Sequence, residues 1–227
     1  SRATRSQEHD MTAKSKGQTL LENAYKLATP QDNKVYYDEF AETYDDEFAR
    51  ALGWEYPNAI ATLYRKNADS DHVPIADIGC GTGLVAEALA VSPEQIDGID
   101  ISEEMLAISR SKALYRKTIQ ADLMADLGPI KNAYGAVVSA GTFTSGHLGP
   151  APLESLLDIA RPDALFIIGV NKTFYLKADF DPFIRDLEAR GAITDLTLVE
   201  VPMYNKAGHD HSSDQAYALC YRKLLSG

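Results

Sequence analysis

Short hydrophobic runs alternate with amphipathic segments along most of this chain. The runs typical of buried strands are 74–78, 95–100, 117–123, 135–140 and 164–170. The intervening segments with apolar positions at helical spacing include 84–90 and 152–161. Strands that alternate with helices favour an α/β fold built on a parallel sheet.

The two ends of the chain differ from this alternation. Residues 181–190 predict a helix ending at Gly191, and 193–201 and 216–223 predict a final pair of strands. We therefore expect a doubly wound, mostly parallel sheet that ends in a hairpin. Before the first strand, apolar and aromatic positions at helical spacing predict an N-terminal helical cap, with Trp54 either a core anchor or a wall of a substrate pocket.

A glycine-rich turn follows the first strand and carries the strongest chemical signal. Asp77 ends the strand, and glycines stand at 79, 81 and 83. Glycine adopts left-handed backbone angles and has no side chain to keep a ligand from the main chain. A dinucleotide site would need its third glycine where Leu84 stands. The carboxylate of Asp77 suits a ligand with a positive group better than a pyrophosphate.

Two further carboxylates follow at strand ends. Asp100 ends the second strand, 17 positions after Gly83, close to the spacing at which an acidic residue binds a ribose. Asp122 ends the third strand. Met105 lies one turn into the helix between them, where a flexible apolar side chain can cover a flat base. These residues together predict a site for a cofactor that contains a nucleoside.

The segment Asp77-Ile-Gly-Cys-Gly-Thr-Gly83 resembles the first motif of class I methyltransferases, which use S-adenosylmethionine. Residues 37–45 are similar to the Tyr-Asp-x-x-Ala-x-x-Tyr-Asp element that precedes it in many small-molecule methyltransferases, and 80–86 resemble the Williams–Beuren-region or methyltransferase-like 27 group. The resemblance covers residue 36 to the end. It implies a Rossmann-like sheet of seven strands whose last strand is antiparallel. It also implies methyl transfer to a small-molecule acceptor, with S-adenosylhomocysteine as product.

The resemblance implies a site residue by residue. Asp100 would bind both ribose hydroxyls, Asp122 would face the adenine amino group, and tyrosines of the cap would close over the methionine end. The implied cofactor-binding set is Asp77, Gly79, Cys80, Gly81, Thr82, Gly83, Asp100, Ile101, Met105, Ala121, Asp122, Leu123, Ser139, Ala140, Tyr37 and Tyr44.

The loop after the fourth strand, 141–150, leaves a carboxyl end of the sheet, where ligands bind in open α/β folds. We expect it to face the methyl donor and the acceptor. His147 in this loop is a candidate catalytic base, and a surface histidine is the alternative.

Two other functions stay open at this point. An NAD(P)-dependent oxidoreductase of Rossmann type is disfavoured by Leu84 and by the lack of a recognisable Tyr-x-x-x-Lys. A non-catalytic protein that binds S-adenosylmethionine is the other. Methyl transfer can proceed by positioning, which contributes about 7–11 kcal/mol without an acid or base, so a missing catalytic residue is not evidence against an enzyme.

Composition limits the classes of molecule that the protein is expected to bind. The net charge of −11 disfavours nucleic acid, and the small basic clusters at 110–112 and 115–117 are interpreted as solvated helix ends. No apolar run approaches the roughly 18 residues that span a membrane. A metal site is not indicated, because neither the two cysteines nor the His-Asp-His trio at 209–211 has the spacing usual for metal ligands.

The start of the chain has no apolar core like that of a secretory signal, so a cytoplasmic protein is expected. We expect residues 1–17 to be a flexible N-terminus, 18–70 the helical cap within the same domain, and 71–227 the cofactor-binding core. The sequence leaves open the acceptor, the oligomeric state and whether a general base is used.

Overall fold

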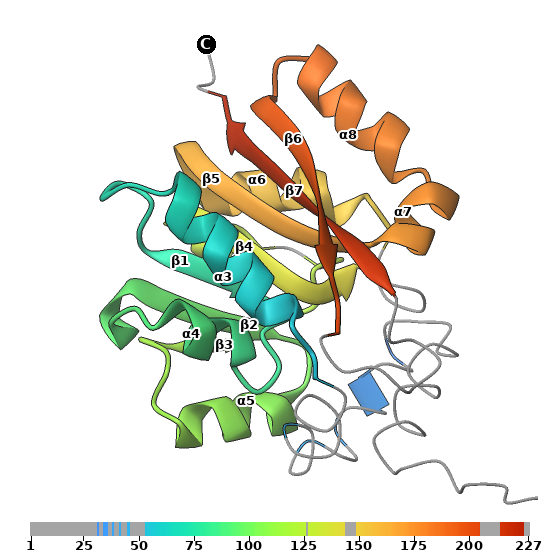
Figure 1. The fold of residues 1–227 in the computed structure, drawn as a ribbon. Coiled ribbons are helices and arrows are strands. Elements are labelled where there is room, and N and C mark those ends of the chain that lie inside the picture. The colour runs from blue at the N-terminus through green and yellow to red at the C-terminus, as the bar shows by residue number, and fades with distance from the viewer. Residues whose placement is uncertain are drawn as a thin grey trace, which may run out of the picture.

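A seven-stranded sheet forms the centre of the computed structural model (Figure 1). The structure describes residues 31, 34, 35, 38, 41, 45, 53–125, 127–143, 149–204 and 214–224. The strands, in chain order, are β1 (Ile75–Ile78), β2 (Ile96–Asp100), β3 (Thr118–Gln120), β4 (Tyr134–Phe143), β5 (Ala160–Asn171), β6 (Ile193–Pro202) and β7 (Gln215–Lys223).

The strand order is β3-β2-β1-β4-β5-β7-β6, and β7 runs antiparallel to both of its neighbours. The predicted doubly wound, mostly parallel sheet with a final hairpin is therefore confirmed. The expected helical cap lies largely outside the described residues, so the division of the chain at 17 and 70 stays a prediction.

Helices cover both faces of the sheet (Figure 1). One face packs against α3 (Tyr56–Asn67), α4 (Leu84–Leu89) and α5 (Glu103–Ser111), and the other against α6 (Pro152–Ile159), α7 (Lys172–Lys177) and α8 (Phe180–Ala189). Two short 3-10 turns are η3 (Pro93–Gln95) and η4 (Gly128–Ile130). The central strands β1 and β4 are buried on both faces, as covered parallel strands should be. No described helix has the length and apolar character needed to cross a bilayer.

The chain order reverses beside β1, and this position determines where a ligand can bind. β1 pairs with β2 on one side and with β4 on the other, in parallel register. The connections that leave β1 and β4 therefore run to opposite faces of the sheet. A crevice opens between such connections, outside the carboxyl ends of the strands.

Some boundaries differ from the sequence expectation. Helix α7 was not predicted, because a helix of six residues is too short to show a hydrophobic period. Its start is set by the Asn171 side chain, which accepts a hydrogen bond from the N–H of Phe174 at 3.0 Å. Strand β5 begins at Ala160 rather than at 164, so the preceding helix ends at Ile159 and not at 161.

Residues 115–117 do not form the expected helix end, because α5 ends at Ser111, but Arg116 and Lys117 are exposed as expected. Tyr115 is partly buried behind the glycine turn, where its hydroxyl donates to Asp77. The Arg116 guanidinium reaches the fully buried carboxylate of Asp97 in β2. The guanidinium donates from Nε at 3.0 Å and from Nη2 at 2.8 Å, and the Tyr134 hydroxyl adds a bond at 2.8 Å. This group joins β2 to the start of β4.

Gly169 in β5 provides a test of the packing between the sheet and α3. A Cβ at Gly169 would lie within 3 Å of three atoms of the buried Tyr56 side chain, whereas a Cβ at Gly149 would meet nothing within 4 Å. We expect Gly169→Ala to lower the free energy of unfolding by about 1–3 kcal/mol, measured by urea denaturation. Gly149→Ala is the matched control, and an equal loss in both variants would contradict this packing.

Candidate functional site

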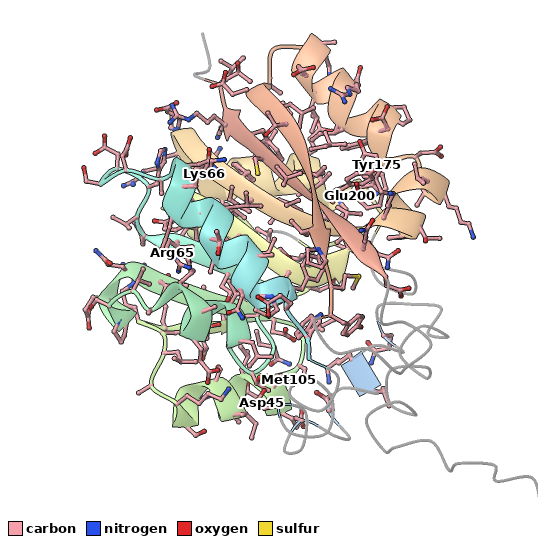
Figure 2. The ribbon with its side chains drawn as sticks, viewed as in Figure 1. Asp45, Arg65, Lys66, Met105, Tyr175 and Glu200 are labelled. Carbon is pink, nitrogen blue, oxygen red and sulfur yellow. The ribbon has the colours of Figure 1, made fainter. Side chains whose placement is uncertain are left out.

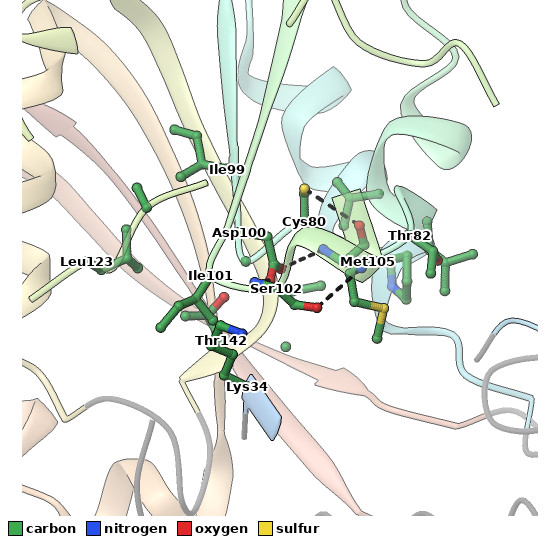
Figure 3. Close-up of a pocket in the computed structure, with 18 of the residues that line it drawn as sticks. Lys34, Cys80, Thr82, Ile99, Asp100, Ile101, Ser102, Met105, Leu123 and Thr142 are labelled. Carbon is green, nitrogen blue, oxygen red and sulfur yellow. Dashed lines mark hydrogen bonds between the residues drawn. The ribbon is translucent and has the colours of Figure 1, made fainter. Parts of the chain in front are cut away.

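A pocket opens at the carboxyl ends of β1, β2 and β4 (Figure 3). Most of its wall comes from turns that follow these strands. The sequence-predicted residues in the wall are Gly79, Cys80, Gly81, Thr82, Asp100, Ile101, Met105, Ala121, Asp122, Leu123 and Ala140. The fold therefore brings together residues that lie up to about 60 positions apart in the chain, since parallel strands end at one edge of the sheet.

Other members of the predicted set lie elsewhere. Asp77, Gly83 and Ser139 do not line this pocket. Tyr37, Tyr44 and His147 lie outside the described residues, so their roles stay predictions.

The wall also contains residues that sequence reasoning did not assign. They are Lys34, Pro57, Leu84, Val85, Ile99 and Ser102, together with Trp54, whose place was left open. Gly141 and Thr142, from the segment expected to face the methyl donor and the acceptor, also line the wall, and the structure places them in β4 and not in a loop. No local pattern marks Lys34 or Pro57, because the fold brings them to the pocket from outside the sheet.

The glycine turn needs its glycines for two different reasons. Gly79, Gly81 and Gly83 have φ angles of 60°, 54° and 96°, in the left-handed region. At Gly79 a Cβ would also collide with the Thr142 hydroxyl, whereas at Gly81 it would meet no atom of the described residues within 4 Å. The turn thus packs closely on β4 at Gly79 and presents bare main chain to the pocket at Gly81.

The carboxylate of Asp100 joins two turns of the site. Oδ2 accepts the N–H of Gly81 at 2.8 Å, and Oδ1 accepts the N–H of Ser102 at 2.8 Å (Figure 3). Burial raises the pKa of Asp100, and these two hydrogen bonds oppose the rise. Each oxygen keeps a second lone pair, so the carboxylate can hold both turns and still accept hydroxyl groups of a ligand.

Ser139 supports the pocket from behind rather than lining it. Its hydroxyl is fully buried and donates to Thr142 Oγ1 at 2.9 Å, and Thr142 in turn donates to the carbonyl of Ile78 at 3.1 Å. This chain of bonds holds the end of β4 against the end of β1. Thr142 lines the pocket and Ser139 does not, and contact of Ser139 with a cofactor stays a prediction.

Asp77 lies beneath the glycine turn, fully buried. Its Oδ2 accepts the Tyr115 hydroxyl at 2.6 Å, and its Oδ1 has no hydrogen-bond partner among the described residues. Burial raises the pKa of Asp77 to about 7, opposed by the bond from Tyr115 and reinforced by the charge of Asp100. Asp77 does not line the pocket, so a role of its charge in ligand binding stays a prediction.

Cys80 is not equipped to act as a nucleophile. Both cysteines of the chain are free and buried. Burial raises the pKa of the Cys80 thiol, and the nearby carboxylates of Asp100 and Asp77 raise it further. A thiol in such surroundings stays protonated and inert. In the described part of the chain, no group of three or more His, Cys, Asp and Glu side chains is arranged to hold a metal ion.

Comparison with known proteins agrees with this geometry. A family model described as a methyltransferase domain matches residues 75–162, which run from β1 into β5 and include most of the pocket wall. The dTDP-3-amino-3,6-dideoxy-alpha-D-glucopyranose N,N-dimethyltransferase of Streptomyces fradiae is 31% identical over 143 residues, which cover 60% of this chain and 52% of that protein. The chain spans about a third of the length of other curated relatives that it matches.

Two solved structures share the fold. The TehB-like SAM-dependent methyltransferase of Corynebacterium glutamicum superposes with a TM-score of 0.55 at 19% identity, over 86% of this chain and all of that one. The [4+2]-cyclase SpnF superposes with a TM-score of 0.62 at 18% identity, over 88% of this chain and 98% of that one. At these identities the likeness concerns the fold alone.

The raised pKa of Asp77 predicts that the free energy of unfolding depends on pH. Because its folded pKa of about 7 exceeds the ordinary 3.8, the folded protein binds more protons than the unfolded chain between these values, and stability falls as pH rises through that window. Between pH 5 and pH 8 we expect the stability of the wild type to fall by about 2–3 kcal/mol relative to Asp77→Asn. Urea denaturation of both proteins at each pH measures this difference. Groups common to both proteins cancel, and parallel pH profiles would contradict the burial of a titrating carboxyl.

Proposed function

Because the chain contains a class I methyltransferase domain, the kind that uses S-adenosylmethionine, we propose that it transfers the methyl group of this cofactor to a small-molecule acceptor. The observation that carries the proposal is the hydrogen bond from the glycine turn to the Asp100 carboxylate, inside the pocket at the carboxyl ends of β1 and β2. S-adenosylhomocysteine as product and a cytoplasmic location belong to the same proposal. The narrower resemblance to the Williams–Beuren-region group stays a prediction.

The residues present fit S-adenosylmethionine. Asp100 has lone pairs to accept both ribose hydroxyls, and Gly81 leaves open space where a side chain would stand. Ile99, Met105 and Leu123 provide apolar surface for an adenine ring. Asp122 stands beside Leu123 at the pocket wall, where its carboxylate suits the adenine amino group.

The chain's own contribution to the reaction is to position the reactants. When bound, S-adenosylmethionine supplies a methyl group made electrophilic by its sulfonium. Holding an acceptor atom in line with such a group contributes about 7–11 kcal/mol toward the barrier without any acid or base. His147 as a base for a hydroxyl or amine acceptor stays a prediction, as do contacts of Tyr37 and Tyr44 with the methionine end.

We place the acceptor on the β4 side of the pocket, beside the loop that follows this strand. Trp54 lies here, and a Cβ at Gly141 would stand 3.4 Å from its ring, so the indole packs against bare main chain. An antiparallel bridge to Tyr204 at the end of β6 holds the Trp54 backbone. Trp54, Pro57 and Gly141 form an apolar wall suited to a small organic molecule. The acceptor of the Streptomyces fradiae relative, named as a dTDP-linked amino sugar, is also a small molecule.

A second candidate is conversion of a bound substrate without methyl transfer. The likeness to SpnF favours this candidate, because that protein has the same fold and is named as a [4+2]-cyclase. Screening small metabolites for conversion of S-adenosylmethionine to S-adenosylhomocysteine separates the two. Turnover with an acceptor supports methyl transfer, and conversion of a substrate without consumption of the cofactor supports the second candidate.

We expect the protein to bind S-adenosylmethionine and not NAD, because the pocket offers carboxylates to the cofactor and Leu84 where a dinucleotide site has its third glycine. Isothermal titration calorimetry with each ligand measures this. Micromolar affinity for NAD with none for S-adenosylmethionine would overturn the proposal.

Replacing Asp100 removes the group expected to hold the ribose. We expect Asp100→Ala to weaken binding of S-adenosylmethionine by about 1.5–3 kcal/mol, the range for hydrogen bonds to a charged group. The freed N–H groups of Gly81 and Ser102 lie in turns that line the pocket and not in the hydrophobic core, so the variant should stay folded by circular dichroism. Glu94→Ala, an exposed site in η3 before β2, is the control. Normal affinity in Asp100→Ala would show that the ribose is held elsewhere.

A further inference from the structure

Two carboxylates from the N-terminal region reach the two turns that Asp100 joins. Asp38 accepts a hydrogen bond from the Ser102 hydroxyl, across 64 positions of sequence. Asp45 accepts a bond from the Thr82 hydroxyl at 2.5 Å, across 37 positions. Thr82 follows Gly81 directly, so each turn is held by Asp100 through its main chain and by an N-terminal carboxylate through its side chain.

The bond from Ser102 to Asp38 determines how the start of α5 is built. Ser102 is the N-cap of this helix and accepts the N–H of Met105 at 3.2 Å. Because the Ser102 hydroxyl donates its hydrogen to Asp38, the lone pairs of Ser102 Oγ can face the N–H of Met105. Ser102 is almost fully buried, so water cannot replace Asp38 easily. Asp38 therefore acts on Met105, a residue of the pocket wall, without being in that wall itself.

Asp38 also orders a second wall residue. Its Oδ2 accepts a bond from Lys34 Nζ at 2.6 Å, and Lys34 lines the pocket. Burial raises the pKa of Asp38, but the hydrogen bonds from Lys34 and Ser102 outweigh it, so the net pKa is lowered. The carboxylate is thus ionised near neutral pH and paired on both oxygens.

Asp45 is held in place by a lysine at the far end of α5. Its Oδ2 accepts a bond from Lys112 Nζ at 2.6 Å, and Lys112 also pairs with Glu87 of α4 at 3.0 Å. The side chains of Lys112 and Asp45 are 20% and 14% exposed, so solvent screens this pair less than it screens a surface pair. Figure 2 labels Asp45 near α5.

We propose that Asp38 and Asp45 are positioning residues of the cofactor site, and that Lys112 is the charge that keeps Asp45 on the glycine turn. The two carboxylates attach the N-terminal region to the pocket through the hydroxyls of Ser102 and Thr82. Affinity for S-adenosylmethionine then depends on Lys112, which does not line the pocket. This inference rests on the function proposed above.

Calorimetric titration of the full chain with S-adenosylmethionine tests the proposal. We expect Lys112→Met and Asp45→Asn each to raise Kd about tenfold, and the double variant also about tenfold, because two residues that act through one contact are not additive. Lys112→Arg, which keeps the charge, should restore Kd to within about threefold of the wild type. Glu87→Gln is the matched control, since Glu87 pairs with the same lysine and with none of the described residues before 53, and its Kd should stay within about twofold.

Urea denaturation of each variant separates positioning from general stability. The proposal expects the midpoints of Lys112→Met and Glu87→Gln to agree while their Kd values differ. It is overturned if Lys112→Met binds like the wild type, if the double variant loses about a hundredfold, or if loss of affinity follows loss of stability across the set. Wild-type protein that binds no S-adenosylmethionine would overturn the proposed function, and this inference with it.

Discussion

The site depends on one carboxylate shared between two turns. β1 and β2 are joined along their length by backbone pairing, but that pairing ends where the chain leaves the sheet. Beyond this point, the two oxygens of Asp100 bind the N–H groups of Gly81 and Ser102 and so keep the two turns at a constant separation. The hydroxyls of Thr82 and Ser102, which bond Asp45 and Asp38, belong to the same two turns that Asp100 joins.

Placing carboxylates at this position has an energetic cost. Asp77 is fully buried and Asp100 partly buried, and loss of solvation is the main cause that raises the pKa of each carboxyl. The charge of Asp100 raises the pKa of Asp77 further. One oxygen of Asp77 has no partner among the described residues. Sites that bind a charged ligand often carry such local costs, because a group that is fully satisfied by the protein has little left to offer a ligand. A ligand with positive charge would favour the ionised forms of both carboxyls.

The local part of this design is readable from sequence. Apolar runs, the left-handed glycine turn and a carboxylate at a strand end are properties of a few consecutive residues, so the positions of β1, β2 and Asp100 could be predicted. The helix α7 could not, because six residues are too few for a period. Strand position alone does not say which of the two hydrogen-bonded hydroxyls, Ser139 or Thr142, lines the pocket, and in the structure it is Thr142.

The sequence by itself determined the fold class, the edge of the sheet where the pocket opens and most of the turn residues that line it. The tertiary structure alone decided the partners of those residues. Asp38 and Asp45 meet the turns across 64 and 37 positions, and Lys34 and Trp54 enter the wall from outside the sheet. It also decided that Asp77 is buried and that Arg116 pairs with Asp97. Burial and long-range pairing depend on which elements pack together, and no run of neighbouring residues contains that information.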